Sequence, residues 1–242
     1  MNGKTMSDGR DRLYAEPLSD VESFVFDEKV AAVFPDMIRR SVPGYGSVIA
    51  LTGIIAARYY QPGSRIYDLG CSQGASTLSI AHQLKQPATI RAVDNSQAML
   101  DLCSSHDYPS SLDVAFTCAD MRDVIVEKAS VVVLNYTLQF IPLAERDAMI
   151  GRIADGMLPG GVLLLSEKLA MPDDLLTGLH HAFKQANGYS ELEVSQKRTA
   201  LENILVPETA QTHSDRLHKA GFGRVEQWFQ CLNFGSFLAI RT

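Results

Sequence analysis

The chain has 242 residues, of which 46% are hydrophobic and 21% charged, with a formal net charge of −6. This composition supports one substantial core, and the acidic balance argues against extensive direct nucleic-acid binding, which needs a basic surface. No apolar run is long enough to span a membrane, and we see no export signal. The four cysteines lack metal-site spacing, so we expect a reduced cytoplasmic protein without a metal.

The segment before the first strand is predicted to be largely helical. The first 25 residues are polar, and we expect the first few to be disordered. Phe26–Arg40 has apolar residues at helical spacing, although Pro35 predicts a break inside it. A loop containing Tyr45 leads to a second predicted helix, Val48–Tyr60. Such a segment can close over the ligand crevice of an α/β sheet, so we interpret residues 1–60 as a helical cap.

Strands and helices then alternate with short loops, which predicts a parallel, doubly wound α/β sheet of the Rossmann type. The predicted elements are strand Arg65–Leu69, helix Ala75–Leu84, strand Thr89–Asp94, helix Ser96–Ser105, strand Asp113–Cys118, strand Ala129–Asn135, helix Leu143–Met157 and strand Val162–Ser166. Later elements are helices Asp173–Lys184, Glu191–Leu205 and Thr209–Ala220 and an antiparallel strand pair, Val225–Phe229 and Phe234–Ile240. We expect a single domain over 1–242, with residues 168–222 as a helical insertion.

A glycine loop follows the first predicted strand. Gly70 and Gly74 let the backbone approach a ligand and direct a helix N-terminus at it, although a simple tight turn would use the same residues. The next strand ends in Asp94, whose carboxylate can bind both hydroxyls of a ribose. The loop lacks the G-x-G-x-x-G pattern and the Lys-Ser/Thr of a phosphate loop, which disfavours NAD and ATP.

Two further strand ends carry candidate ligand residues. Asp120 follows the third strand and could accept a hydrogen bond from an adenine amino group, while Met121 could offer its backbone N–H. An N-cap role explains Asp120 equally well. Asn135 ends the fourth strand at the carboxyl edge, where such sheets bind ligands, but it could also be a turn residue.

Together these features resemble the class I S-adenosylmethionine-dependent methyltransferases, over roughly Gln61 to Thr242. The resemblance implies a seven-stranded, mostly parallel sheet with an antiparallel last strand. It also implies that Gly70 and Ser72 line the methionine part of the cofactor, with the acids described above at the ribose and adenine. After Asn135 the sequence reads Tyr-Thr-Leu-Gln rather than Pro-Pro-Tyr, which disfavours direct methylation of a flipped base.

Longer stretches resemble the carboxy-S-adenosylmethionine synthase family. They are Phe34–Tyr45, Asp68–Ser72, Asn187–Arg198 and Glu226–Ser236. The resemblance implies that prephenate loses carbon dioxide to give phenylpyruvate. The methyl carbon of S-adenosyl-L-methionine, as a sulfonium ylide, captures that carbon dioxide. The product, carboxy-S-adenosyl-L-methionine, would pass to a tRNA carboxymethyltransferase that modifies the wobble uridine to uridine-5-oxyacetic acid.

The same resemblance assigns the new carboxylate to Arg198, whose guanidinium suits it better than an ammonium. A solvated charge beside Lys197 is the alternative. Arg198 lies outside the regular alternation, so it could reach the site from a second subunit, and we expect a homodimer. Tyr45 is expected to cover the cofactor, unless it is only a half-buried core residue. The implied cofactor-binding set is Tyr45, Gly70, Cys71, Ser72, Asp94, Asn95, Asp120, Met121, Asn135 and Arg198.

No general base stands out from the sequence. His180 and His181 form a helical pair, which is more typical of surface or packing positions than of catalysis. Hydroxide expelled from prephenate could itself take the methyl proton, so catalytic residues remain unassigned. Arg39 and Arg40 are further cations that a dicarboxylate could use. Two alternatives stay open: an ordinary methyltransferase acting on a small molecule or tRNA, and a non-catalytic cofactor-binding module.

Overall fold

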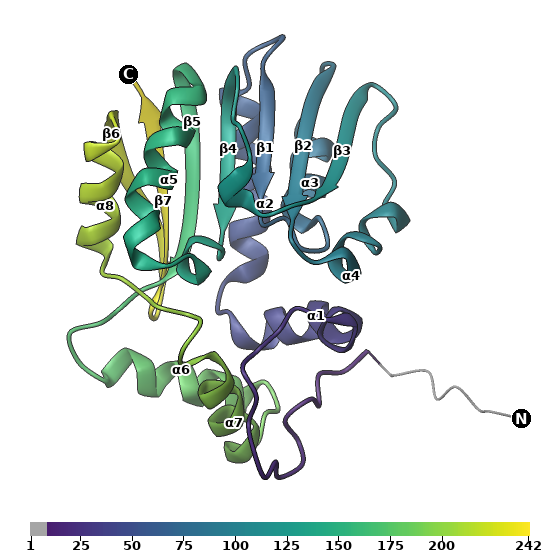
Figure 1. The fold of residues 1–242 in the computed structure, drawn as a ribbon, viewed down its shortest axis with the longest axis vertical. Helices are drawn as coiled ribbons and strands as arrows, with labels where there is room; N and C mark the ends of the chain where they lie inside the picture. Colours follow the sequence, from purple (N-terminus) through teal and green to yellow (C-terminus); the bar gives the residue numbers. More distant parts are fainter. Residues whose placement is uncertain (1–8) are drawn as a thin grey trace, which may run out of the picture.

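The computed structural model describes residues 9–242, so the expectation for the first few residues lies outside the described part. Seven strands form one sheet in the order β3-β2-β1-β4-β5-β7-β6 (Figure 1). Neighbouring strands run parallel except β7, which is antiparallel to both β5 and β6. The strands are β1 (Arg65–Leu69), β2 (Ala88–Asp94), β3 (Leu112–Cys118), β4 (Ala129–Asn135), β5 (Met157–Lys168), β6 (Phe222–Cys231) and β7 (Phe234–Arg241). The predicted mostly parallel sheet with an antiparallel last strand is confirmed.

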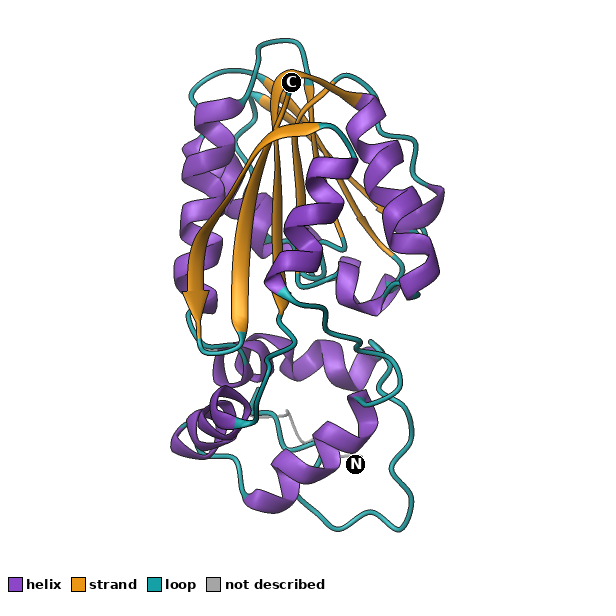
Figure 2. Cartoon of the chain, turned by 90° about the vertical axis from the view of Figure 1, so that its left-hand side faces the viewer, coloured by secondary structure: helices purple, strands orange, loops and turns teal. Residues whose placement is uncertain are grey.

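Helices cover both faces of this sheet (Figure 2). The central strand β4 is apolar on both sides, as expected for a buried parallel strand. Val131 and Val133 pack with α2 (Tyr45–Tyr59) and α3 (Ala75–Gln83). Val132 and Leu134, which point the other way, pack in the cluster that includes α5 (Leu143–Gly156) and α8 (Ala210–Lys219). The alternation of side chains along one strand therefore holds two helical layers on one sheet.

The helix predicted over Ser96–Ser105 is shorter in the structure. Ser96 caps it as expected, accepting the backbone N–H of Met99, but α4 spans only Gln97–Leu100. A 3₁₀ turn, η1 (Cys103–Ser105), follows. The hydroxyls of Ser104 and Ser105 bond to nearby backbone carbonyls, and this competition weakens a regular helix.

The break predicted at Pro35 is wrong, because α1 runs without interruption over Glu28–Ser41. Proline has no N–H to give to the carbonyl four residues earlier, which belongs to Ala31. That carbonyl instead accepts a hydrogen bond of 2.6 Å from the Gln73 side chain. Gln73 lies in the glycine loop, so its side chain ties α1 to the loop by bonding the carbonyl that Pro35 leaves without a donor.

A second group of helices lies below the carboxyl ends of the strands (Figure 1). We call α1, α6 (Leu175–Ala186), α7 (Glu191–Leu201) and the irregular segment 9–27 the cover. The segment is joined to α7 by hydrogen bonds from Leu18 N–H to Gln196 Oε1 and from Phe24 N–H to the carbonyl of Ala200. Residues far apart in sequence therefore build one face of the molecule. The division into one domain with a cap and an insertion stays a prediction.

Candidate functional site

A cavity of about 670 Å³ separates the carboxyl ends of the parallel strands from the cover. Its sheet side carries Asp120 after β3, Asp94 on β2, the glycine loop after β1, Asn135 on β4 and Lys168 on β5. Because neighbouring strands lie about 4.8 Å apart, the sheet order sets these groups in a row roughly 19 Å long. A cavity of this size accommodates a small-molecule ligand.

Nine of the ten residues predicted from the sequence to bind a cofactor line this cavity. They are Tyr45, Gly70, Cys71, Ser72, Asp94, Asn95, Asp120, Met121 and Asn135. The tenth, Arg198, does not. Residues from four strand ends and from the start of α2 are thus brought together as the sequence predicted, while their roles toward a cofactor stay predictions.

The glycine loop is shaped by backbone that favours glycine. Gly70 has φ +76°, and a Cβ atom there would overlap Cγ2 of Thr137. Ser72 has φ +50°, an uncommon value for a non-glycine residue. Its backbone N–H donates to Asp94 Oδ2 at 2.8 Å, which compensates for this conformation. Gly70 is therefore required by its close packing against Thr137, and Gly70 and Ser72 both line the cavity, while a close approach to a ligand stays a prediction.

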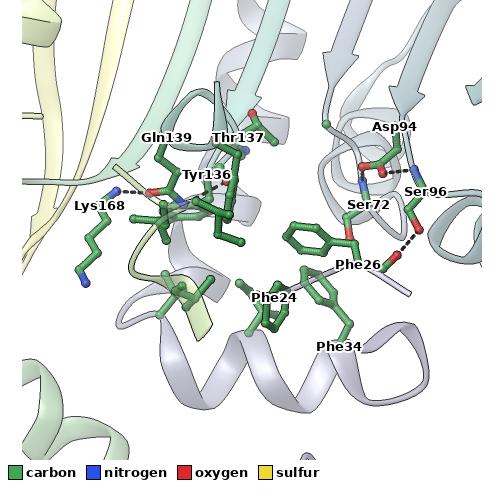
Figure 3. A pocket seen from close by; sticks show the side chains of 18 of the residues that line it. Phe24, Phe26, Phe34, Ser72, Asp94, Ser96, Tyr136, Thr137, Gln139 and Lys168 are labelled. Carbon is green, nitrogen blue, oxygen red and sulfur yellow. Dashed lines mark hydrogen bonds between the residues drawn. The ribbon is translucent and has the colours of Figure 1, made fainter. Parts of the chain in front are cut away.

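Asp94 is held in a fixed orientation (Figure 3). Its Oδ2 accepts the Ser72 N–H, and its Oδ1 accepts the Ser96 N–H at 2.9 Å. Burial raises the pKa of Asp94, although these hydrogen bonds oppose the effect. Each oxygen keeps a lone pair for a further donor, as binding to a ribose diol requires. The Ser96 hydroxyl also donates to the carbonyl of Phe26, which attaches the cover to this end of the cavity.

Asp120 makes the contacts of an N-cap. Its Oδ1 accepts the backbone N–H of Arg122 at 2.8 Å, and the same arginine's side chain forms an ion pair of 2.6 Å with Oδ2. This pairing lowers the pKa of Asp120. Asp120 therefore does cap the following 3₁₀ turn, as the alternative interpretation of the sequence predicted. Asp120 and Met121 still border the cavity, so a role at an adenine remains a prediction.

Asn135 and Tyr136 carry unpaired polar atoms beside the cavity. The Asn135 amide donates to Ser76 Oγ at 2.9 Å and to Thr52 Oγ1 at 3.3 Å. Its Oδ1 is buried and, among residues 9–242, has no partner, and the same holds for the Tyr136 hydroxyl. Buried polar atoms without partners are rare and indicate a missing ligand or water. Asn135 Oδ1 thus suits the ammonium of an amino-acid ligand, which fits S-adenosylmethionine.

The loop after β4 is held by a buried carboxyl group. Glu167 accepts the backbone N–H groups of Leu138 and Gln139 at 2.9 and 3.0 Å. Burial raises the pKa of Glu167 to about 8. Tyr136 in this loop has φ +63°, a conformation that costs about 1–2 kcal/mol and persists where surrounding contacts enforce it. No pattern in the sequence predicted this role of Glu167.

Tyr45 begins α2, and its ring centroid lies 6.1 Å from that of Tyr136. It packs against a buried cluster that contains Val42, Val48 and Phe234. Burial raises the pKa of its hydroxyl, which stays protonated and able to donate. Both readings of Tyr45 therefore fit its position: it is half-buried against the core, and it lines the cavity.

The structure also brings in residues that the sequence analysis missed. Lys168, Lys184 and Lys197 line the part of the cavity beyond Asn135. Lys168 directly ends β5, so its place at a strand end was a usable signal. His180, considered a surface or packing residue, is only 2% exposed and borders the same cavity. An aromatic group of Phe24, Phe26, Phe34 and Phe140 forms part of the wall.

Arg198 lies on the outer side of α7 and is exposed. It borders a small surface pocket with His181, outside the main cavity. Arg39 is also exposed, while Arg40 is buried in an ion pair of 2.7 Å with Asp36. None of the three arginines proposed from the sequence lines the cavity of its own chain. Whether Arg198 serves a second subunit stays a prediction.

No group of three or more histidine, cysteine, aspartate or glutamate side chains among residues 9–242 is arranged to hold a metal ion. In the same residues, no helix has the length and apolar character needed to cross a membrane.

Known proteins resemble this chain both in sequence and in fold. Residues 66–161 match the methyltransferase domain family. The chain is 54% identical to the carboxy-S-adenosyl-L-methionine synthase of Trichlorobacter lovleyi, covering 98% of this chain and 100% of the relative. It is 50% identical to the Shigella sonnei protein of the same name, covering 96% and 97%. Human N-acetylserotonin methyltransferase, solved in complex with SAM, superimposes with a TM-score of 0.60 at 17% identity, covering 97% of this chain and 63% of that chain. These likenesses confirm the class I methyltransferase fold.

Proposed function

The chain belongs to the carboxy-S-adenosyl-L-methionine synthase family of enzymes, and from this we propose that it carboxylates S-adenosyl-L-methionine with carbon dioxide from prephenate. The supporting observation is the row of groups along the sheet edge. A fixed carboxylate, a close-approach glycine loop and an unpaired amide oxygen are followed directly by lysines. The first three suit the nucleoside and amino acid of S-adenosylmethionine, and the lysines suit an anionic second substrate.

The proposed reaction balances in atoms and charge. Prephenate breaks its bond to the ring carboxyl group and expels hydroxide, which gives phenylpyruvate and carbon dioxide. A proton leaves the S-methyl group, a carbon–carbon bond forms to carbon dioxide, and hydroxide takes the proton to give water. S-adenosylmethionine supplies the acidic methyl group next to its sulfonium. A general base from the protein is not required by this balance.

The residues of the chain would bind and orient the two substrates. Asp94 would accept the ribose hydroxyls, since Ser72 and Ser96 already hold its oxygens in place. Asn135 Oδ1 would accept the amino group of the methionine part. Tyr45, which lies under the cover, would shield the reacting carbon from water. Water exclusion matters because it strengthens each electrostatic contact in the site.

Arg198 is proposed to bind the new carboxylate across a homodimer, because it does not line the cavity of its own chain. The product would then serve a tRNA carboxymethyltransferase in the cytoplasm, where it supports formation of wobble uridine-5-oxyacetic acid. We propose no direct contact of this chain with nucleic acid. An ordinary methyltransferase is the second candidate, favoured by the methyltransferase domain match over residues 66–161.

One experiment separates the two candidates. Purified enzyme is incubated with S-adenosylmethionine and prephenate, and the nucleoside products are measured by mass spectrometry. The proposal predicts a product heavier than S-adenosylmethionine by one carbon dioxide, formed only with prephenate. If prephenate is not consumed and no carboxylated product forms, the proposal is wrong.

The role of Arg198 is tested by Arg198→Ala, with Arg224→Ala on the exposed side of β6 as the matched control. We expect the first change to remove the preference for carboxylated over unmodified cofactor and the second to keep it. Equal preference in both variants would contradict the role of Arg198.

A further inference from the structure

Three lysines from three separate elements meet at one end of the cavity. Lys168 ends β5, Lys184 lies on α6 and Lys197 lies on α7. Figure 3 shows Lys168 on the opposite side of the pocket from Ser72 and Asp94. Since β5 is the strand next to β4, this end borders the position of Asn135. A ligand held by the lysines would therefore lie beside the methionine part of the proposed cofactor.

The lysines carry more positive charge than the protein around them neutralises. Lys197 is 5% exposed and pairs with Asp11 at 3.4 Å. Lys184 is 8% exposed, and no carboxylate among residues 9–242 forms an ion pair with Lys184 or Lys168. The exposed Arg198 adds charge near Lys168. Buried charges are normally paired, so this arrangement lacks an anion.

The missing anion affects the pKa values of Lys184 and Lys168. Burial, followed by repulsion from Lys197 and Lys168, lowers the pKa of Lys184 to about 7. Burial and then the charge of Arg198 lower the pKa of Lys168 as well. A carboxylate placed between these ammonium groups would reverse both shifts, because an opposite charge favours the charged form.

His180, which borders the same cavity, offers a hydrogen-bond acceptor beside the ammonium donors of the lysines. His180 Nε2 lies 2.7 Å from the carbonyl oxygen of Ser41, and because a carbonyl only accepts, Nε2 carries the hydrogen. Its Nδ1 is then an acceptor, and it is buried without a partner among the described residues. Burial lowers the pKa of His180 to about 3, so the ring stays neutral at physiological pH. It can therefore accept a hydrogen bond from a hydroxyl group.

We infer that Lys168 and Lys184 form the carboxylate subsite for the carboxyl donor, a small dicarboxylate, and that His180 Nδ1 accepts a hydrogen bond from the hydroxyl group of that substrate. Lys197, already paired with Asp11, positions α7 against the subsite and supplies background charge. This inference rests on the proposed function for the identity of the donor. The presence of an anion-binding subsite next to the cofactor can be tested without relying on the proposed reaction.

The test uses Lys184→Met, which removes the charge at nearly constant volume. Lys184→Arg retains the charge, and Lys85→Met makes the same chemical change at an exposed position. We expect the KM for prephenate to rise about 30-fold or more in Lys184→Met, as for loss of one partner of a buried charge pair. The Kd for S-adenosylmethionine should change little. Lys184→Arg should recover part of the loss, and Lys85→Met should match the wild type.

A direct binding measurement separates this inference from the proposed function. Benzylmalonate, a non-reactive aromatic dicarboxylate, is titrated calorimetrically into wild type, Lys184→Met and Lys168→Met, each saturated with S-adenosylmethionine. If prephenate yields no carboxylated product but benzylmalonate binding depends on both lysines, the proposed function fails and the subsite stands. If product forms but the variants keep the wild-type KM and benzylmalonate affinity, the subsite is overturned. Failure of both dicarboxylates to bind the wild type also overturns it.

Discussion

Removing the charge of Lys184 should make the ligand-free protein more stable, in contrast to most substitutions of buried residues. The structure lowers the pKa of this lysine from 10.5 to about 7. That difference corresponds to about 5 kcal/mol at most, since each pKa unit is worth about 1.36 kcal/mol. Below pH 7 the folded protein holds a buried cation without an anion, and this full amount opposes folding.

The sign of the pH dependence follows from proton uptake. Between pH 7 and 10.5 the unfolded lysine keeps its proton while the folded one loses it, so the free energy of unfolding rises with pH. Methionine at this position has no such dependence. We expect Lys184→Met to exceed the wild type by a few kcal/mol at pH 6.5, and the advantage to shrink toward pH 10. Lys197 contributes to both proteins, so its effect largely cancels in the difference.

Urea unfolding followed by circular dichroism, without ligand, measures this difference at pH 6.5 and 9.5. Lys85→Met serves as the exposed control and should stay within about 0.5 kcal/mol of the wild type at both values. A variant no more stable than the wild type at pH 6.5, or a difference that does not change with pH, would refute the reasoning. Higher stability together with weaker anion binding is the combination expected for a group retained for function.

Two further predictions concern the glycine loop. Gly70→Ala should destabilise the protein more than Gly63→Ala, because both glycines have positive φ but, of the two, Gly70 alone lacks space for a Cβ atom. Unfolding curves and the Kd for S-adenosylmethionine, measured for both variants, test this. Equal effects of the two changes would contradict it. Gln73→Ala should cost about 1–2 kcal/mol by leaving the Ala31 carbonyl unpaired, and adding Pro35→Ala should recover part of it, since alanine restores an N–H for that carbonyl. A double-mutant cycle without coupling would argue against the bond.

The sheet, and the residues that line the sheet side of the cavity, were predictable because their signals are local. Gly70 and Gly74 directly follow one predicted strand, and Asp94 ends the next. Residues in such positions must lie at the carboxyl edge of a parallel sheet. Parallel strands gather these ends at one side whatever lies between them. Nine predicted residues therefore lie around one cavity although they span positions 45 to 135.

The other half was not predictable in this way. Lys184 reads as an ordinary charge on an amphipathic helix, and only the packing of α6 under the sheet buries it. The burial of His180 beside the same cavity likewise depends on this packing. Pro35 breaks a helix by local rules, but a side chain 38 residues later supplies the missing donor. Sequence periodicity shows which face of a helix is apolar, but it does not show which element covers that face.

The cover forms late during synthesis, because its first segment bonds to residues far along the chain. Asp11 accepts a hydrogen bond from Tyr189, and Leu18 bonds to Gln196, each across 178 residues. At about 5–20 residues per second, the ribosome needs roughly 10 to 40 s to make the partners of the first segment. The hydrogen bond from the Phe24 N–H to the carbonyl of Ala200 cannot form before then. Because α6 and α7 also line the cavity, the complete ligand-binding site is among the last features of the chain to form.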